Sequence, residues 1–180
     1  MYWYKRSLWA APILLLICLQ ACKQEGSENS HDMKYFDLKG FFRADSAHLA
    51  KLNPLVDKTV IHNKVKETKK VHITDWGSEL SLFSESDINK PAWRDSYNVQ
   101  SLDNFLIYRA KDPKLKTQEI LIKRTGSIIK GILIYNHTKN ILYETKEILS
   151  YYPDSAYSIT KKQSVRLLGT DNYSIRSSFN

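Results

Sequence analysis

The chain has 180 residues, of which 42% are hydrophobic and 26% charged, and its formal net charge is +8. This length is sufficient for one domain with a substantial core. The lysines and arginines are spread along the chain, which is typical of a solvated, lysine-rich surface. Anionic lipid headgroups or polysaccharide remain alternative explanations for the charge.

The N-terminal residues predict export. Lys5 and Arg6 form a positive end, residues 8–19 form an apolar stretch of about a dozen residues, and Ala21 fits a small-residue cleavage site. The apolar stretch is shorter than the ~20 residues that a membrane-spanning helix needs. Residues 19–22, Leu-Gln-Ala-Cys, resemble the lipobox of bacterial lipoproteins, in which the cysteine is lipidated and becomes the first residue of the mature chain.

This resemblance implies a signal peptide over residues 1–21 and a membrane anchor at Cys22, made of fatty acyl chains such as palmitate. Two or more chains make anchoring stable, because each buried methylene contributes about 0.8 kcal/mol. Lys23 resembles the outer-membrane sorting pattern, so we expect a cell-envelope protein at the outer membrane, where nucleic acid is not an expected partner. A freely soluble protein with a cleaved signal and a protein with an uncleaved anchor are the alternatives.

Cleavage before Cys22 would change the thiols and the charge. Cys18 leaves with the signal, so Cys22 becomes the only thiol and no intramolecular disulfide can form. The cleavage also removes Lys5 and Arg6 but no acid, which lowers the net charge by two, from +8 to +6. Residues 22–33 thus comprise the lipidated Cys22 and the polar residues 23–33, which predict a flexible tether between the anchor and the fold.

Two helices are expected before the main run of strands. The first covers residues 34–53 and ends before Pro54, because the residue before proline avoids the α region. Its apolar stripe consists of Leu38, Phe42, Leu49 and Leu52. The second helix covers residues 76–86, with Asp75 as its N-cap. Between the two, residues 56–73 predict a hairpin that turns at Asn63-Lys64.

An antiparallel meander is expected from Tyr97 onward. Its strands cover residues 103–110, 118–125, 128–136, 141–149, 156–162, 164–168 and 173–179. The turn signals between them are Asp112-Pro113, Gly126-Ser127, residues 136–140, Pro153-Asp154 and residues 169–172. In the last strand, Tyr173, Ile175 and Phe179 alternate with Ser174, Arg176 and Ser178.

Residues 120–122 and 132–135 are apolar on both faces, as in strands that are covered on both sides. Only two helices are expected to cover this sheet. Either they cover one face while curvature or a partner protects the other, or an apolar cavity remains between the sheet and the helices. The fold class we expect is α+β, with two helices packed on a curved antiparallel sheet of about six to seven strands, plus an N-terminal hairpin. It forms a single domain over residues 34–180.

No residues form a recognisable catalytic or metal-binding pattern. Asp45, Ser46 and His48 share a helix on which adjacent residues do not face each other. With the turn at Asn63-Lys64, His62 and His72 point to opposite faces. The acids near the second helix are Asp75, Glu79, Glu85 and Asp87, and a helix N-terminus favours acids electrostatically. We therefore expect no catalytic residue, no metal and no cofactor.

Four aromatic residues are candidates for ligand binding: Trp76, Trp93, Tyr151 and Tyr152. Trp76 and Trp93 bracket the second helix, and the two tyrosines precede Pro153. A stacking platform for sugar or peptide is one interpretation. The other is structural, because antiparallel strands and their edges are normally rich in tyrosine.

The whole chain resembles the small lipoproteins of Bacteroidota, through the signal, the lipobox and the phrases at residues 87–94 and 149–155. This resemblance implies lipidation at Cys22 and no particular catalysis. We expect a membrane-anchored, non-enzymatic binding or assembly module whose partner is an envelope protein. One alternative is a carrier of a lipid-like ligand in an apolar cavity, and another is a hydrolase of envelope polymers.

Overall fold

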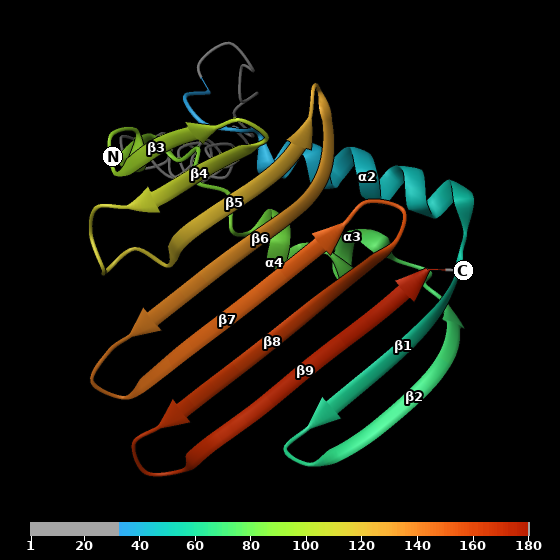
Figure 1. Ribbon diagram of the computed structural model, residues 1–180. Helices are drawn as coiled ribbons and strands as arrows, with labels where there is room; N and C mark the ends of the chain where they lie inside the picture. The colour runs from blue at the N-terminus through green and yellow to red at the C-terminus, as the bar shows by residue number, and fades with distance from the viewer. Residues whose placement is uncertain (1–32, 180) are drawn as a thin grey trace, which may run out of the picture. The chain divides into compact units, whose positions relative to one another are not determined.

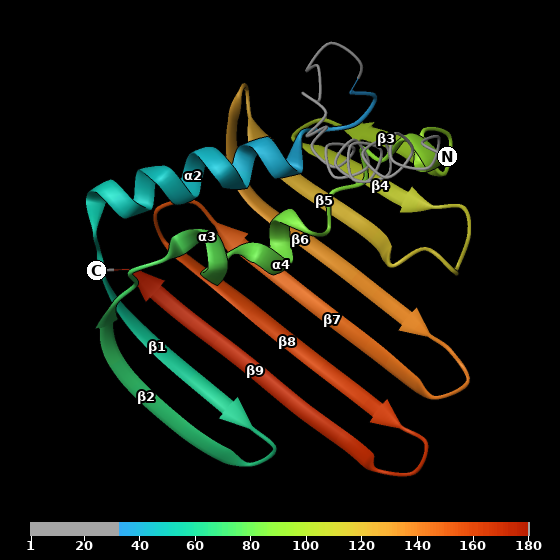
Figure 2. The same cartoon turned by 180° about the vertical axis from the view of Figure 1, so that it is seen from behind.

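Nine antiparallel strands form one sheet, and the helices lie on one face of it (Figures 1 and 2). The computed structural model describes residues 33–179, so the predicted signal peptide and Cys22 lie outside the described residues. The strand order is β2-β1-β9-β8-β7-β6-β5-β4-β3. The strands are β1 (Leu55–His62), β2 (Val65–His72), β3 (Tyr97–Leu102), β4 (Phe105–Ala110), β5 (Thr117–Thr125), β6 (Ile128–Lys139), β7 (Tyr143–Tyr152), β8 (Ala156–Val165) and β9 (Gly169–Phe179).

The predicted α+β class with an antiparallel sheet is confirmed, but the count of six to seven strands is wrong. The hairpin β1–β2 is part of the same sheet, because β1 pairs with β9. Val56 pairs with Phe179 and Val60 with Ile175, so the apolar row of β9 continues onto β1. The N-terminal hairpin therefore lies beside the last strand of the chain. Patterns within a short stretch of sequence do not reveal such a long-range pairing.

Two strand boundaries differ from the prediction for a chemical reason. The segments expected at 156–162 and 164–168 are the single strand β8, in which Lys161 and Gln163 take inward positions normally held by apolar residues. Strand β3 was not expected. Five of its six residues are exposed, so it lacks the alternation of buried and exposed residues by which a strand is recognised. It is a short edge strand, a position where polar side chains discourage pairing with other chains.

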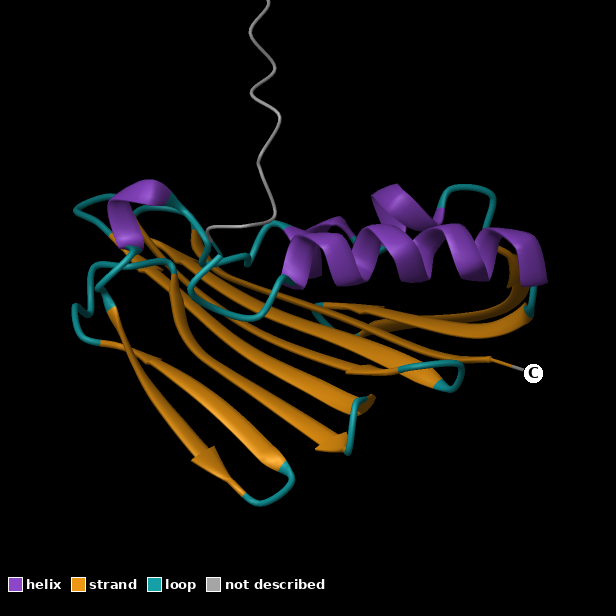
Figure 3. Cartoon of the chain, turned by 90° about the horizontal axis from the view of Figure 1, so that it is seen from above, coloured by secondary structure: helices purple, strands orange, loops and turns teal. Residues whose placement is uncertain are grey.

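The turns are mostly where the sequence places them. Asn63, Gly126 and Asp154 take positive φ values of 51°, 59° and 54°. β6 runs to Lys139, through most of the turn expected at 136–140, and β9 begins at Gly169, where a turn was expected. The sheet is visibly bent (Figure 3), and register shifts interrupt the pairing of β5 with β6 at two places, as β-bulges do.

The first helix, α2 (Leu38–Leu52), confirms the predicted amphipathic stripe over most of its length. Leu38, Phe42 and Leu49 are buried, whereas Leu52, the last helical residue, is exposed. At the start of α2 the carboxylate of Asp37 accepts a hydrogen bond from the Gly40 backbone N–H at 2.7 Å. This contact satisfies one of the amide groups that a helix leaves unpaired at its N-terminus.

The second predicted helix is broken. It consists of α3 (Trp76–Glu79) and α4 (Ser81–Ser84), separated at Leu80, and a short 3₁₀ helix, η3 (Pro91–Trp93), follows. Asp75 caps α3 as expected, accepting from the Ser78 backbone N–H at 3.0 Å. Serine hydroxyls compete for backbone groups here: Ser84 Oγ donates to the Ser81 carbonyl. Such bonds, and Gly77, weaken a continuous helix.

The core lies between the helices and the inward face of the sheet. The ring of Phe42 lies 5.0 Å, centre to centre, from those of Phe83 and Tyr151. Trp76 meets Phe179 edge-on at 5.2 Å. The central strands are apolar on both faces because their inward residues pack on this core while their outward residues form a second surface. Within the described residues, none of the helices has the length and apolarity needed to cross a membrane.

Phe42→Ala should lower the free energy of unfolding by about 3–5 kcal/mol, because it empties the space shared with Phe83 and Tyr151. Leu52→Ala, on the same helix, is the matched control and should change stability by less than about 0.5 kcal/mol, since Leu52 is exposed. Chemical denaturation measures both. Equal losses in the two variants would contradict the packing described for α2.

Candidate functional site

Beyond the helices, the inward face of the sheet becomes polar. Strand pairing places Asn136, Glu147 and Lys161 in one row across β6, β7 and β8. The next row consists of Thr138, Thr145 and Gln163. Together with Tyr143 and Lys116, these residues line a pocket of about 290 Å³, which we call the polar pocket.

A hydrogen-bonded network forms the inner wall of the polar pocket. Asn136 Nδ2 donates to Ser86 Oγ at 2.9 Å and to Glu147 Oε2 at 3.2 Å. The other carboxylate oxygen, Glu147 Oε1, lies 3.3 Å from Lys161 Nζ. Ser86 Oγ in turn donates to the Leu82 carbonyl at 2.7 Å. The network therefore connects the chain just after α4 to the middle of the sheet.

Two members of this network are unusually buried for their polarity. Asn136 is 1% exposed and Glu147 is 5% exposed. The Asn136 Oδ1 atom has no hydrogen-bond partner among the described residues. A buried polar atom without a partner costs free energy, so such atoms are rare in folded proteins and call for an explanation.

The opposite face of the sheet, which we call the open face, has no described helix over it (Figures 1 and 3). Apolar side chains of β3 to β7 gather there. By the strand register, this open-face patch consists of Leu102, Phe105, Ile107, Leu121, Leu133, Tyr135, Ile148 and Tyr152. Leu133, Ile148 and Tyr152 are 41%, 49% and 52% exposed. Contiguous exposed apolar residues of this kind mark interaction surfaces.

A glycine helps to shape the open-face patch. A Cβ atom at Gly131 would lie 3.2 Å from Cε1 of the Tyr152 ring, so the ring rests closely on the β6 backbone at this residue. An aromatic side chain from a neighbouring strand often covers a glycine in this way. The contact keeps Tyr152 against the sheet while about half of its surface faces solvent.

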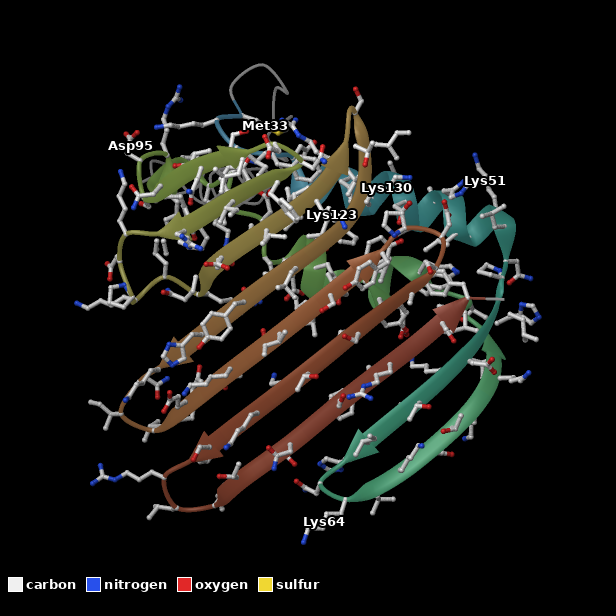
Figure 4. The ribbon with its side chains drawn as sticks, in the orientation of Figure 1. Met33, Lys51, Lys64, Asp95, Lys123 and Lys130 are labelled. Carbon is white, nitrogen blue, oxygen red and sulfur yellow. The ribbon has the colours of Figure 1, made fainter. Side chains whose placement is uncertain are left out.

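The strands of the open face carry an excess of positive charge. Its cationic residues are Lys66, Lys70, Arg109, Lys123, Lys139, Lys146, Lys162 and Arg176, and its acidic residues are Asp57, Glu119 and Glu144. Each acid lies near a cation, as in the 2.7 Å contact of Arg109 with Glu119. Figure 4 looks onto this face and labels Lys123, which shares a row with Phe105.

The four aromatic residues predicted to bind a ligand do not form one platform. Trp76 and Tyr151 are buried in the core, whereas Tyr152 belongs to the open-face patch. Trp93 is half-buried in η3, with Lys90 Nζ 4.1 Å from its ring centre. Their role in ligand binding stays a prediction, and Tyr152 is the one that the open-face patch includes. Cys22 lies outside the described residues.

Two buried tyrosines, Tyr151 and Tyr157, anchor the helices to the sheet through their hydroxyls. Tyr151 donates to the carboxylate of Asp45 on α2, and Tyr157 donates to Glu79 on α3. Burial, reinforced by the carboxylate beside each ring, raises the pKa of both phenols, so both stay protonated as donors. Burial also raises the pKa of Asp45, more than the Tyr151 hydrogen bond lowers it.

The residues considered for catalysis have separate partners. Ser46 Oγ donates to the Trp76 carbonyl at 3.3 Å, while His48 lies 3.3 Å from Asp154. The acids near α3 are equally dispersed. Asp75 caps the helix, Glu79 pairs with Lys58 at 2.6 Å, and the carboxylate of Asp87 accepts from the Asn89 backbone N–H at 3.1 Å.

The histidines of the hairpin lie as the sequence predicts. His62 pairs with Val65, so the turn is at Asn63-Lys64 and His62 and His72 point to opposite faces. His62 Nε2 lies 2.7 Å from Asp171, and His72 Nδ1 lies 3.0 Å from the Asn53 carbonyl oxygen. Within residues 33–179, no group of three or more His, Cys, Asp or Glu side chains is placed to hold a metal ion.

Sequence reasoning missed the polar pocket, although the sequence contains a signal for it. Glu147 and Thr145 continue the alternation of Tyr151 and Leu149, so parity alone puts them on the inward face. A run of inward positions that changes from apolar to polar indicates where helical cover ends. The rows across β6, β7 and β8 become evident only once strand register is known.

These features define an α+β protein with a helix layer on one face of a sheet, a polar pocket beside that layer and an apolar patch on the opposite face. No protein-family model matches the chain, and no curated protein or solved structure matches it either. Its function must therefore be argued from the residues themselves.

Asn136→Asp should destabilise the protein in a pH-dependent way, because it sets a second carboxylate beside the buried Glu147. Mutual repulsion raises the pKa of the pair above its unfolded value, so the folded state binds a proton that the unfolded state releases. We expect a loss of about 3 kcal/mol at pH 7, shrinking as the pH falls toward 5.

Asn140→Asp is the matched control, because its side-chain oxygen accepts from the backbone N–H groups of Leu142 and Tyr143 and a carboxylate does the same. It should change stability by less than about 0.5 kcal/mol at either pH. Denaturant unfolding at pH 5 and pH 7 measures both variants. A loss in Asn136→Asp that did not depend on pH would contradict the contact between residues 136 and 147.

Proposed function

We propose that this protein is a lipid-anchored, non-enzymatic binding module of the cell envelope, at the outer membrane, and that its open-face patch docks onto an acidic partner protein. The observation that supports this most directly is a contiguous set of apolar side chains, most of them partly or well exposed, on a sheet face without described helical cover. Interfaces bury apolar and aromatic residues at their centre and place charged residues at the rim.

Charge favours an acidic partner over a second copy of the chain. The open face carries the eight cationic and three acidic side chains named above. Two copies packed face to face would bring two surfaces with the same excess of positive charge together. Like charges at an interface cost free energy, whereas an acidic surface complements this rim and accelerates association.

The strands that are apolar on both faces suggested a cavity for a lipid-like ligand, but these residues have another explanation. Ile132 and Ile134 are buried on the inward side, and Leu133 and Tyr135 belong to the open-face patch. Where α2 and α4 meet β7, the rings of Phe42, Phe83 and Tyr151 occupy the space between helix and sheet. A surface partner therefore accounts for the outward apolar residues better than an enclosed ligand does.

The anchor is tested by acyl labelling in the native host. Cys22→Ser should abolish incorporation of labelled palmitate and move the protein from the membrane to the aqueous fraction, because the acylated sulfur is lost. Cys18→Ser is the matched control and should leave labelling unchanged, since residue 18 precedes the expected cleavage site. Labelling that survived in Cys22→Ser, or vanished in Cys18→Ser, would overturn the proposed anchor.

The open-face patch is tested by photo-crosslinking in intact cells. A photo-crosslinking residue at Ile148 should form an adduct with a protein partner through an acidic segment, while one at Leu167, which is 93% exposed, should not. In the Ile148 background, Leu133→Lys should reduce the adduct at least tenfold, because it removes apolar contact from the patch although it adds a positive charge that an acidic partner would favour. Leu168→Lys is the matched control in the β8–β9 turn and should leave the adduct intact.

Two results would count against the partner. Adducts only with a second copy of the chain or with lipid would refute an acidic protein as the occupant. Equal adducts at Ile148 and Leu167 would refute the open face as the docking surface.

A further inference from the structure

Each charged residue that lines the polar pocket already has a partner. Both carboxylate oxygens of Glu147 have partners, Asn136 Nδ2 and Lys161 Nζ. Lys116 Nζ lies 3.9 Å from Glu85 at the rim. A charged ligand would have to compete with these contacts, which favours an electrically neutral ligand.

The remaining lining groups are uncharged and bond in both directions. Thr138, Thr145 and Tyr143 contribute hydroxyls, which both donate and accept, and Gln163 contributes an amide. Asn136 adds its amide oxygen, an acceptor without a partner in the part of the chain that the structure describes. A matching ligand must carry several groups that donate and accept within a short distance of one another.

We propose that the polar pocket binds a single neutral sugar ring, an aldohexose or an N-acetylhexosamine. Each sugar hydroxyl donates one hydrogen bond and accepts others, so adjacent hydroxyls satisfy the row of Thr138, Thr145 and Gln163. Tyr143, which is partly exposed at the rim, offers an aromatic face to the C–H groups of the ring.

The size and lining of the polar pocket agree with this ligand class. Ligand pockets usually range from ~300 to 1,000 Å³ and are mostly apolar. This one, at about 290 Å³, is at the small end and is lined almost entirely by polar side chains. One ring with its hydroxyls fits that space, whereas the polar lining would leave an acyl chain or an aromatic ligand surrounded by unpaired polar groups.

The open-face patch and the polar pocket are on opposite sides of the sheet, as the alternation of β7 shows. Ile148 belongs to the open face, and its neighbour Glu147 points to the pocket side. The sugar site is therefore a second function, independent of the docking surface, and either proposal can fail without the other.

The test uses the full-length protein in detergent, titrated with glucose, galactose, mannose and N-acetylglucosamine and followed by NMR. At least one sugar should bind saturably with a Kd of about 1 mM or tighter. Thr145→Val removes one pocket hydroxyl at nearly constant volume and should weaken binding at least tenfold. Thr160→Val makes the same change on the open face and should leave binding unchanged.

A second pocket variant distinguishes loss of binding from loss of folding. Gln163→Leu alters a half-buried residue outside the Asn136–Glu147 network and should also weaken binding at least tenfold while the protein keeps its unfolding midpoint. Failure of all four sugars to saturate would overturn the proposal. So would saturable binding of alanine or inorganic phosphate in their place, or equal weakening by Thr145→Val and Thr160→Val.

Discussion

The packing of Tyr151 is the contact on which the rest of the structure depends. Its ring is fully buried and lies within 5.0–6.3 Å of the rings of Phe41, Phe42 and Phe83, and its hydroxyl donates to Asp45. One side chain of β7 thus joins α2, α4 and the sheet. Tyr157 does the same for α3, through Trp76 and Glu79. These aromatic contacts hold the described helices against the inward face of the sheet.

Where that cover ends, the chemistry of the inward face changes. Along β7 the inward residues are Tyr151, Leu149, Glu147 and Thr145, so two apolar positions under the helices are followed by two polar ones beyond them. Glu147 remains buried because Asn136 and Lys161 flank it and Ser86 closes the network from above. The polar pocket is therefore a consequence of a sheet longer than its helical cover.

Local sequence patterns predict part of this arrangement well. The stripe of α2, the N-cap at Asp75 and the alternation of β9 all depend on neighbours within a few residues, and each is found in the structure. The break at Leu80 was not predicted, because the amphipathic pattern of Trp76, Leu80 and Phe83 continues across it. The pairing of β1 with β9 joins residues more than 100 positions apart, and local sequence patterns give no information about contacts over that separation.

The candidate sites are harder to predict than the fold, for a related reason. A residue such as Leu133 is indistinguishable in sequence from the buried Ile132 and Ile134 beside it, and only the absence of described helices on the open face makes it a surface residue. Likewise, Thr138, Thr145 and Gln163 look like ordinary strand residues until strand register sets them in one row. Both sites arise from one asymmetry, a wide sheet covered partly and on one side. The uncovered apolar surface suits a large partner, and the uncovered polar surface beside the helices suits a small one.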